Sequence, residues 1–307
     1  MRNINIIEKP IVKYLFVQFF NLLSIFLGIT FLAFFLIKFS TSNISILNIF
    51  KEFLFWFIKS ISGNLGETLY GEKIINNLLF SLFNTIKISF GAILFSFIIS
   101  AVISWLWYKI ENVQLLSKLL RLLITFSNIP LFLAAFIVSL LVNYFAIDIY
   151  DSSTTLYEKI IYYFLPILIL SIFDGTIYEI CQSIKSTIEQ IKNEPFIIAL
   201  ELRGYSRKKH ILRHLSFTLL DILSSKLVHF LGGAIVVEII FNIHGIGYLG
   251  YRAIQLRDFN LFLAIIFFVS LLVLIIFFII KVVSVYFNPT YKNRINTTNS
   301  FLELMKI

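Results

Sequence analysis

The sequence predicts an all-α, polytopic membrane protein with six transmembrane helices, and three observations lead to this class. Of the 307 residues, 59% are hydrophobic and only 14% are charged, whereas soluble domains carry about 25% charged residues. Six apolar runs reach the roughly 20 residues needed to cross about 30 Å of hydrocarbon. The spans must be helices, because lipid offers no partner to an unpaired backbone group.

The expected spans follow one another along the chain, and the fifth is the least clean of them. It holds Asp221, Lys226 and His229 in its first half, and Asp221 is expected to form a network with Lys226 or His229 at the cytoplasmic mouth. The first run is of span length and lacks the small-residue cleavage site of a signal peptide, so we expect it to stay as an anchor. The six ranges are 14–37, 79–107, 119–147, 160–181, 217–241 and 261–286.

The distribution of basic residues predicts the orientation. Lys and Arg gather in the N-terminal tail, in the loops 108–121 and 182–215, and in the C-terminal tail. The positive-inside rule therefore places both termini in the cytoplasm of a bacterial inner membrane. The net charge of +9 reflects this topology rather than a nucleic-acid partner.

The remaining organisation is that of a single membrane domain over residues 1–307, with a core at about 75–290. The external loop 38–78 contains an aromatic, partly charged segment at 44–62. Two interpretations of that segment stand: a helix lying on the membrane surface, or a loop packed on the bundle.

Several kinds of chemistry have no signature in the chain. A single cysteine, Cys181, excludes an internal disulfide, and no phosphate-binding loop of the form G-x-x-x-x-G-K-[ST] occurs. His210 and His214 have metal-ligand spacing, but Lys209 and Arg213 beside them disfavour a cation. We therefore expect no catalytic residue, no metal site and no cofactor in this chain, which would not be an enzyme.

A polar segment between the fourth and fifth spans predicts a short projecting helix. Pro195 suits a first helical position after Glu194, Gly204 suits a left-handed helix end, and Ser206 can cap the next helix. Docking into a groove of another protein is one interpretation. The other is an ordinary loop whose charges only fix topology. Exposed apolar bulk is expected at Phe196, Ile197, Leu200 and Tyr205.

This segment resembles the EAA loop of bacterial ABC-importer permeases. The similarity is closest to the first permease of oligopeptide, dipeptide and nickel importers, and Arg213-His214 continues it. Departures from the pattern are Pro195, Leu200, Glu201 and Leu202. The residues that hold the pattern are Glu194, Phe196, Ile197, Ala199, Arg203, Gly204 and Ser206.

A second stretch resembles the same subgroup. It runs from Gly232-Gly233-Ala234 through Glu238 and Phe241 to Gly245-Ile246-Gly247, with His244 where proline is usual. The glycines permit close helix approach or a hinge, and plain packing is the alternative. Glu238 is expected near the external surface, where it contacts substrate, is hydrated, or pairs with Arg252 or Arg257. Further matches are Gly63-Asn64-Leu65-Gly66, Asn128-Ile129-Pro130, Leu165-Pro166, Arg257-Asp258-Phe259 and Asn288-Pro289.

The resemblance implies a type I ABC-importer permease fold and a set of partners. These are a homologous second permease, two cytoplasmic ATP-binding subunits that hold ATP and Mg, an extracytoplasmic substrate-binding protein and the lipid bilayer. It implies ATPase coupling through Glu194, Pro195, Phe196, Ala199, Arg203, Gly204 and Ser206, and a translocation path or hinge at Gly232, Gly233 and Glu238.

The implied cargo is an oligopeptide or dipeptide, and nickel or another small solute is the alternative. A different class, an ion-driven secondary transporter, would call for intramembrane carboxylates or broken helices near the midplane. We expect few of either in these spans.

Overall fold

The computed structural model describes residues 4–41, 46–110, 114–144, 156–192, 194–204 and 207–287. Within these ranges the chain is helical with short turns, and the β-structure found there is one isolated bridge between Glu67 and Lys73. The chain divides into two compact units, residues 1–75 with 253–307, and residues 76–252. One membrane domain over residues 1–307 stays a prediction.

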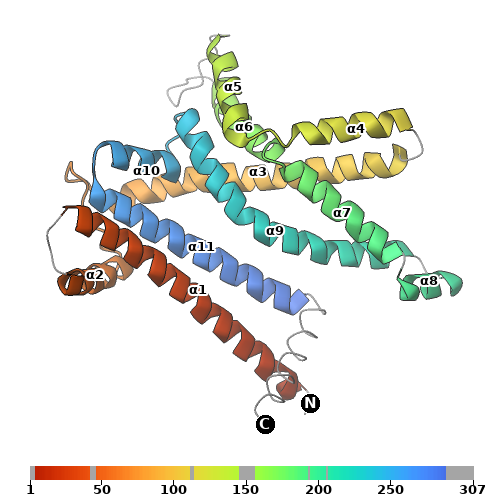
Figure 1. The fold of residues 1–307 in the computed structure, drawn as a ribbon, viewed down its shortest axis with the longest axis horizontal. Coiled ribbons are helices and arrows are strands. Elements are labelled where there is room, and N and C mark those ends of the chain that lie inside the picture. Colours follow the sequence, from red (N-terminus) through yellow and green to blue (C-terminus); the bar gives the residue numbers. More distant parts are fainter. Residues whose placement is uncertain are drawn as a thin grey trace. The chain divides into compact units, whose positions relative to one another are not determined.

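Eleven α-helices make up the described ranges (Figure 1). They are α1 (Ile4–Thr41), α2 (Ile46–Ile61), α3 (Ile74–Ile110), α4 (Gln114–Phe126), α5 (Leu131–Tyr144), α6 (Leu156–Ile172), α7 (Thr176–Lys192), α8 (Pro195–Leu202), α9 (Arg207–Ile240), α10 (Ile246–Gln255) and α11 (Phe259–Phe287).

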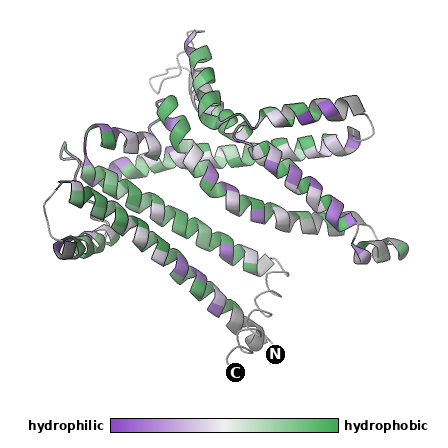
Figure 2. Ribbon diagram, viewed as in Figure 1, coloured by the Kyte–Doolittle hydropathy of each residue, from purple (hydrophilic) through white to green (hydrophobic). Residues whose placement is uncertain are grey.

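Four helices, α1, α3, α9 and α11, are each long and apolar enough to cross a membrane. Hydrophobic residues run along most of the length of α1, α3 and α11 (Figure 2). Two further helix pairs pass the same test only together: α4 with α5, bent by 89°, and α6 with α7, bent by 49°. Six spans result if each bent pair crosses once. The third and fourth spans are therefore not the continuous helices expected.

Each break contains a residue that favours it locally, and backbone hydrogen bonds join the two breaks to each other. Pro130 has no N–H to continue α4, and Gly175 takes a φ of +72° that favours glycine. The backbone N–H of Asp174 donates to the carbonyl of Ile129 (3.1 Å), and that of Gly175 to Ser127 (2.7 Å). Backbone groups freed by one break are thus satisfied by the other, as a membrane interior requires.

The core of the unit 76–252 is packed from α3, α5, α6 and α9. Gly233 on α9 meets this core closely: a Cβ there would lie 2.5 Å from Leu170 Cδ1 and 2.9 Å from Leu131 Cδ2. Gly232 faces open space instead, with nothing within 4 Å. The expected close helix approach is present at Gly233 and absent at Gly232. Buried core side chains include Ile88, Ala92, Leu131, Ala135, Leu170, Phe230, Ala234 and Val237.

The other unit is built from α1, α2 and α11. Phe53 and Trp56 on α2 pack on Phe34 of α1, with ring centroids 5.7 and 5.5 Å away. On the opposite side of α2, Phe55 and Ile58 are exposed. Within the segment 44–62, α2 is thus an amphipathic helix that packs by one face. This combines parts of both interpretations, a helix and a packed segment.

The start of α11 is fixed by Asp258, which lies in the expected Arg-Asp-Phe stretch. Its Oδ1 accepts the N–H of Leu261 (3.0 Å), a helix cap. Its Oδ2 accepts the N–H of Leu69 in the external loop (2.9 Å). Asp258 is only 3% exposed, so this carboxylate joins the loop to α11. Asn288 and Pro289 lie outside the described residues.

Candidate functional site

The short helix expected after the fourth span is present as α8, packed against α7 and α9 (Figure 1). It begins at Pro195, and the carbonyl of Glu194 accepts the N–H of Ile197 (2.9 Å). It ends at Leu202, and Gly204 follows with a φ of +76°, the left-handed conformation that terminates helices. The next helix, α9, begins three residues later.

The surface of α8 differs in part from the expectation. Pro195, Ala199, Arg203 and Gly204 are exposed, as docking would require. Ile197 is wholly buried, so its assignment to exposed apolar bulk is wrong; the side chain holds α8 to its neighbours.

Leu202 is 84% exposed. It was named as a departure from the family's pattern but not as exposed apolar bulk, although its place at the helix end beside Arg203 could have indicated this. Ser206, Tyr205 and the side chains of Phe196 and Leu200 lie outside the described part of the chain.

The turn between α9 and α10 explains the second glycine-rich stretch. Glu238 is fully buried, and its Oε2 accepts the N–H of Gly247 (2.7 Å). A carboxylate at this place caps α10 and complements its dipole. The expectation that Glu238 is hydrated near a surface is wrong. Gly245 leaves room for it, because a Cβ there would lie 2.3 Å from Glu238 Oε1.

The same turn is tied to α3. Asn84 Nδ2 donates to the carbonyl of His244 (3.0 Å), and the N–H of Ile246 donates to Thr85 Oγ1 (2.8 Å). Only the carbonyl of His244 is used in the first bond, which is why a residue other than proline is accommodated there. Gly232, Gly233 and Glu238 thus stand in different surroundings, and their role in a path or hinge stays a prediction.

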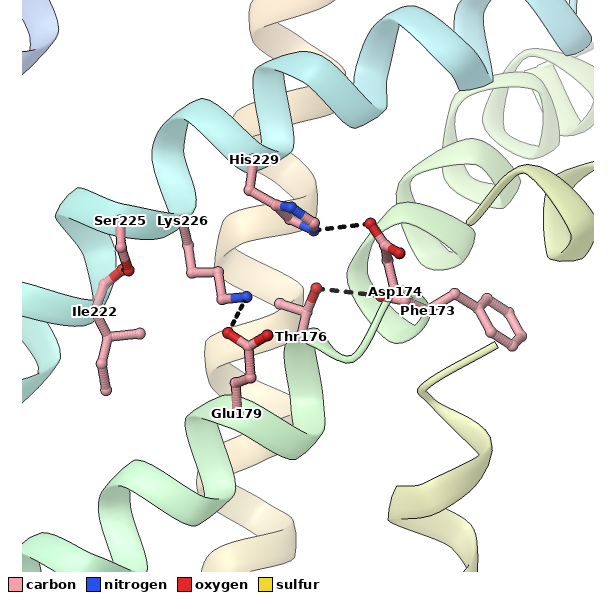
Figure 3. Close-up of polar contacts among 8 residues, drawn as sticks. All are labelled: Phe173, Asp174, Thr176, Glu179, Ile222, Ser225, Lys226 and His229. Carbon is pink, nitrogen blue, oxygen red and sulfur yellow. Dashed lines mark hydrogen bonds and ion pairs between the residues drawn. The ribbon is translucent and has the colours of Figure 1, made fainter. Parts of the chain in front are cut away.

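A group of four ionisable side chains joins α9 to the break between α6 and α7 (Figure 3). His229 Nε2 lies 3.3 Å from Asp174 Oδ2, and Lys226 forms an ion pair with Glu179. Lys226 and His229 share a face of α9, because residues three apart are neighbours on a helix. We call Asp174, Glu179, Lys226 and His229 the ion-pair cluster.

The ion-pair cluster lies in the middle of the candidate spans. His229 is at the centre of the apolar stretch Thr218–Ile240 of α9, and Asp174 separates the two halves of the bent pair Tyr162–Ile172 and Thr176–Lys192. The side chain of Lys226 is 8% exposed, and those of Asp174 and Glu179 are 42% and 58% exposed. The ammonium group of Lys226 is therefore enclosed, while the carboxylates of Asp174 and Glu179 face outward.

Sequence reasoning had found half of this cluster. It expected Asp221 to form a network with Lys226 or His229, whereas the carboxylates that contact those two side chains, Glu179 and Asp174, come from another span. The sequence could have indicated Asp174 and Glu179, because both lie in the expected span 160–181. An ionisable side chain within a span is costly and is a functional candidate by default. The expectation of few broken helices is wrong, because two of the spans are bent pairs. The expectation of few intramembrane carboxylates stays a prediction.

Among the described residues, no group of three or more His, Cys, Asp and Glu side chains is arranged to hold a metal ion. Cys181 is buried on α7, and its thiol donates to the carbonyl of Ser100 at a distance of 3.6 Å.

The chain thus has bent spans, contacts between charged side chains at mid-span, and the short helix α8 between α7 and α9. These are features of a multi-pass membrane transport component. Residues 114–290, more than half of the chain, match the family described as binding-protein-dependent transport system inner membrane component. The chain belongs to this family of ABC-importer permeases.

Similar curated proteins include several that are named nickel import system permease protein NikB. The protein from Staphylococcus aureus strain bovine RF122 / ET3-1 is 25% identical over 251 residues, covering 80% of this chain and 74% of its own. That from strain MRSA252 is 26% identical over 255 residues, covering 80% and 75%. These relatives support a permease of the oligopeptide, dipeptide and nickel type.

Proposed function

We propose that this chain is the membrane-spanning half of an ATP-driven importer and that α8 receives the movement of a separate ATP-binding subunit. The observation that carries the proposal is α8 itself: a two-turn helix started by Pro195, stopped by Gly204 and wedged against α7 and α9. The same segment resembles the family's loop at Glu194, Ala199, Arg203 and Gly204, with Pro195 as a departure.

The mechanism follows from how α8 is attached. Buried Ile197 anchors it to its neighbours, while Ala199, Leu202 and Arg203 are exposed. A push on the exposed side is therefore passed to α7 and α9. Since α9 also carries Lys226 and His229, the movement reaches the ion-pair cluster. The spans then rock between outward-facing and inward-facing arrangements around a fixed route.

The partners in this proposal are a second homologous permease, two cytoplasmic ATP-binding subunits with ATP and Mg, and an extracytoplasmic binding protein. Both termini would be cytoplasmic. Gly232 and Gly233 would serve as a hinge on α9. Glu194, Phe196 and Ser206 complete the proposed ATPase contact.

Two cargoes are proposed. The printed names of the relatives favour nickel, and resemblance to the wider subgroup favours oligopeptides or dipeptides. Uptake of radioactive nickel and of a labelled dipeptide by vesicles that hold the complete importer separates the two. An ion-driven secondary transporter has mid-span carboxylates and broken helices in its favour, but membership of the ABC-permease family speaks against it.

The coupling role is tested with Gly204→Asp, compared with Gly71→Asp as a matched control. Both glycines have similar φ, +76° and +78°, with nothing within 4 Å of an added Cβ. Both substitutions therefore cost about 1 kcal/mol of left-handed strain. We expect Gly204→Asp, like Phe196→Ala, to abolish uptake while the permease stays inserted. Gly71→Asp should retain uptake.

Solute-stimulated ATPase activity of the reconstituted complex supplies the second readout. Loss of the stimulation in Gly204→Asp supports coupling through α8. Unchanged stimulation in that variant counts against the coupling role, whatever the uptake.

A further inference from the structure

The two carboxylates of the ion-pair cluster are exposed where a membrane protein can least tolerate it. Asp174 and Glu179 lie in the bent span 162–192 and are 42% and 58% exposed on this chain. An ionised side chain in contact with acyl tails costs several kcal/mol. Lipid is therefore disfavoured as their neighbour. The alternatives are a partner subunit, or the water and solute that a transport route supplies, and the labelling experiment below separates them.

The backbone around the cluster supports the same conclusion. Both bent spans break beside it, at 127–130 and 173–175, and the breaks exchange hydrogen bonds. Non-helical backbone at membrane depth is tolerated where it is buried in protein or lines a water-filled cavity. Gly175 is buried, yet Asp174 next to it is exposed. The break thus presents its carboxylate outward.

The acidic and basic side chains of the cluster differ in how accessible they are to a passing solute. Lys226 is enclosed, with 8% of its side chain exposed, and is held by Glu179. His229 is 31% exposed and is largely neutral at pH 7 in its ordinary state. The accessible groups are therefore mainly the two carboxylates, and the cluster favours an added positive charge.

We propose that Asp174 and Glu179 line the solute route of this permease and are specificity-determining residues that favour solutes bearing a positive charge. This rests on the proposed importer function. His229 and Lys226 are their partners in the absence of solute, and a cationic group displaces His229 from Asp174 as it passes. A protonated amine and a divalent metal ion share the required charge.

Access to the route is tested by thiol labelling in vesicles that contain the complete importer. The probe is a trimethylammonium methanethiosulfonate, which is cationic and stays in water. Wild-type chain is the internal control, because its one thiol, Cys181, is 1% exposed on the same helix. Gln182→Cys lies one turn from Glu179 on the same face, is exposed and leaves both ion pairs intact.

We expect rapid labelling of Gln182→Cys and of Glu179→Cys, and none of the wild-type chain. Absence of labelling at both introduced thiols overturns the proposal, because it means that this face is sealed by protein or lipid. Gln182→Cys keeps the contacts of Asp174 and Glu179, so its labelling result remains informative even if Glu179→Cys fails to fold.

Charge preference is tested by the uptake of radioactive nickel and of a labelled dipeptide with a free amino group. Asp174→Asn removes one charge with little change of shape. We expect the maximal uptake of the solute that is carried to fall about tenfold, as for loss of one charge-assisted contact. Glu189→Gln, a carboxylate near the end of α7 that pairs with Lys185, is the matched control and should retain uptake.

The two proposals fail in different ways. Stimulated ATPase activity should persist in Asp174→Asn, because α8 is untouched, while uptake falls. Wild-type uptake in both Asp174→Asn and Glu179→Gln overturns the specificity role and leaves the importer function standing. A complex in which Gly204→Asp keeps its stimulated ATPase activity overturns the coupling and leaves the labelling result valid.

Discussion

Gly247→Ala is expected to loosen the corner between α9 and α10. A Cβ at this position would lie 2.5 Å from Ile235 Cα and 2.8 Å from Ile235 Cβ. The nearest obstacle is a backbone atom of α9, so no side-chain rotation relieves it. The start of α10 must move away from α9.

The expected cost has two parts. Overpacking against a fixed neighbour costs about 1–3 kcal/mol. Moving the N–H of Gly247 off the buried Glu238 carboxylate, 2.7 Å away, forfeits a bond to a charged group, about 1.5–3 kcal/mol. Partial relaxation keeps the sum near about 3 kcal/mol. For a chain of this length 1 kcal/mol corresponds to less than about 2 °C, so the midpoint of thermal unfolding falls by roughly 5 °C.

Gly232→Ala is the matched control, since its Cβ would meet nothing within 4 Å. The gain in helix propensity is worth up to about 1 kcal/mol, so this variant should be as stable as wild type or slightly more. Thermal unfolding in one detergent, followed by the loss of the monodisperse peak, compares the two. Equal midpoints for Gly247→Ala and Gly232→Ala would refute the reasoning about this corner.

Phe53→Ala, with Phe55→Ala as its control, and Asp258→Ala test the unit of α1, α2 and α11. Phe53→Ala removes a ring that is 5% exposed and should cost about 3–5 kcal/mol, whereas Phe55→Ala, 64% exposed, should leave the unfolding midpoint unchanged. Asp258→Ala frees the N–H groups of Leu261 and Leu69 and should cost about 1–2 kcal/mol, with faster proteolysis of the loop around residues 63–73; equal proteolysis rates would contradict the cap.

Much of the helical layout could be predicted from the sequence because it rests on local properties. Apolar length gave α1, α3, α9 and α11, and the backbone preferences of Pro195 and Gly204 gave both ends of α8. These features depend on residues within a few positions of each other, so reading along the chain suffices.

The breaks at 127–130 and 173–175 could not be predicted in this way. Asn128-Ile129-Pro130 was noted as a motif, but its bend depends on backbone bonds from Asp174 and Gly175, about 45 residues further on. Pro166, by contrast, lies inside α6 without ending it. A proline alone therefore does not decide between a continuous and a broken span.

Pairing of charged groups was missed for the same reason. The sequence places Lys226 and His229 near Asp221, yet the contacts described above join them to Glu179 and Asp174 of another span. Glu238 was expected near a surface because of its place at a span end. The fold turns α10 back over it, which the glycines at 245 and 247 permit.

The central claim is that α8 transmits the force of a separate ATP-binding subunit. Cross-linking from Leu202→Cys, at a position 84% exposed, tests it most directly in the assembled importer. We expect a cross-link to the ATP-binding subunit whose yield changes between the nucleotide-free and ATP-bound states. An intact, transporting complex in which Leu202→Cys reaches no ATP-binding subunit in either state would contradict the account.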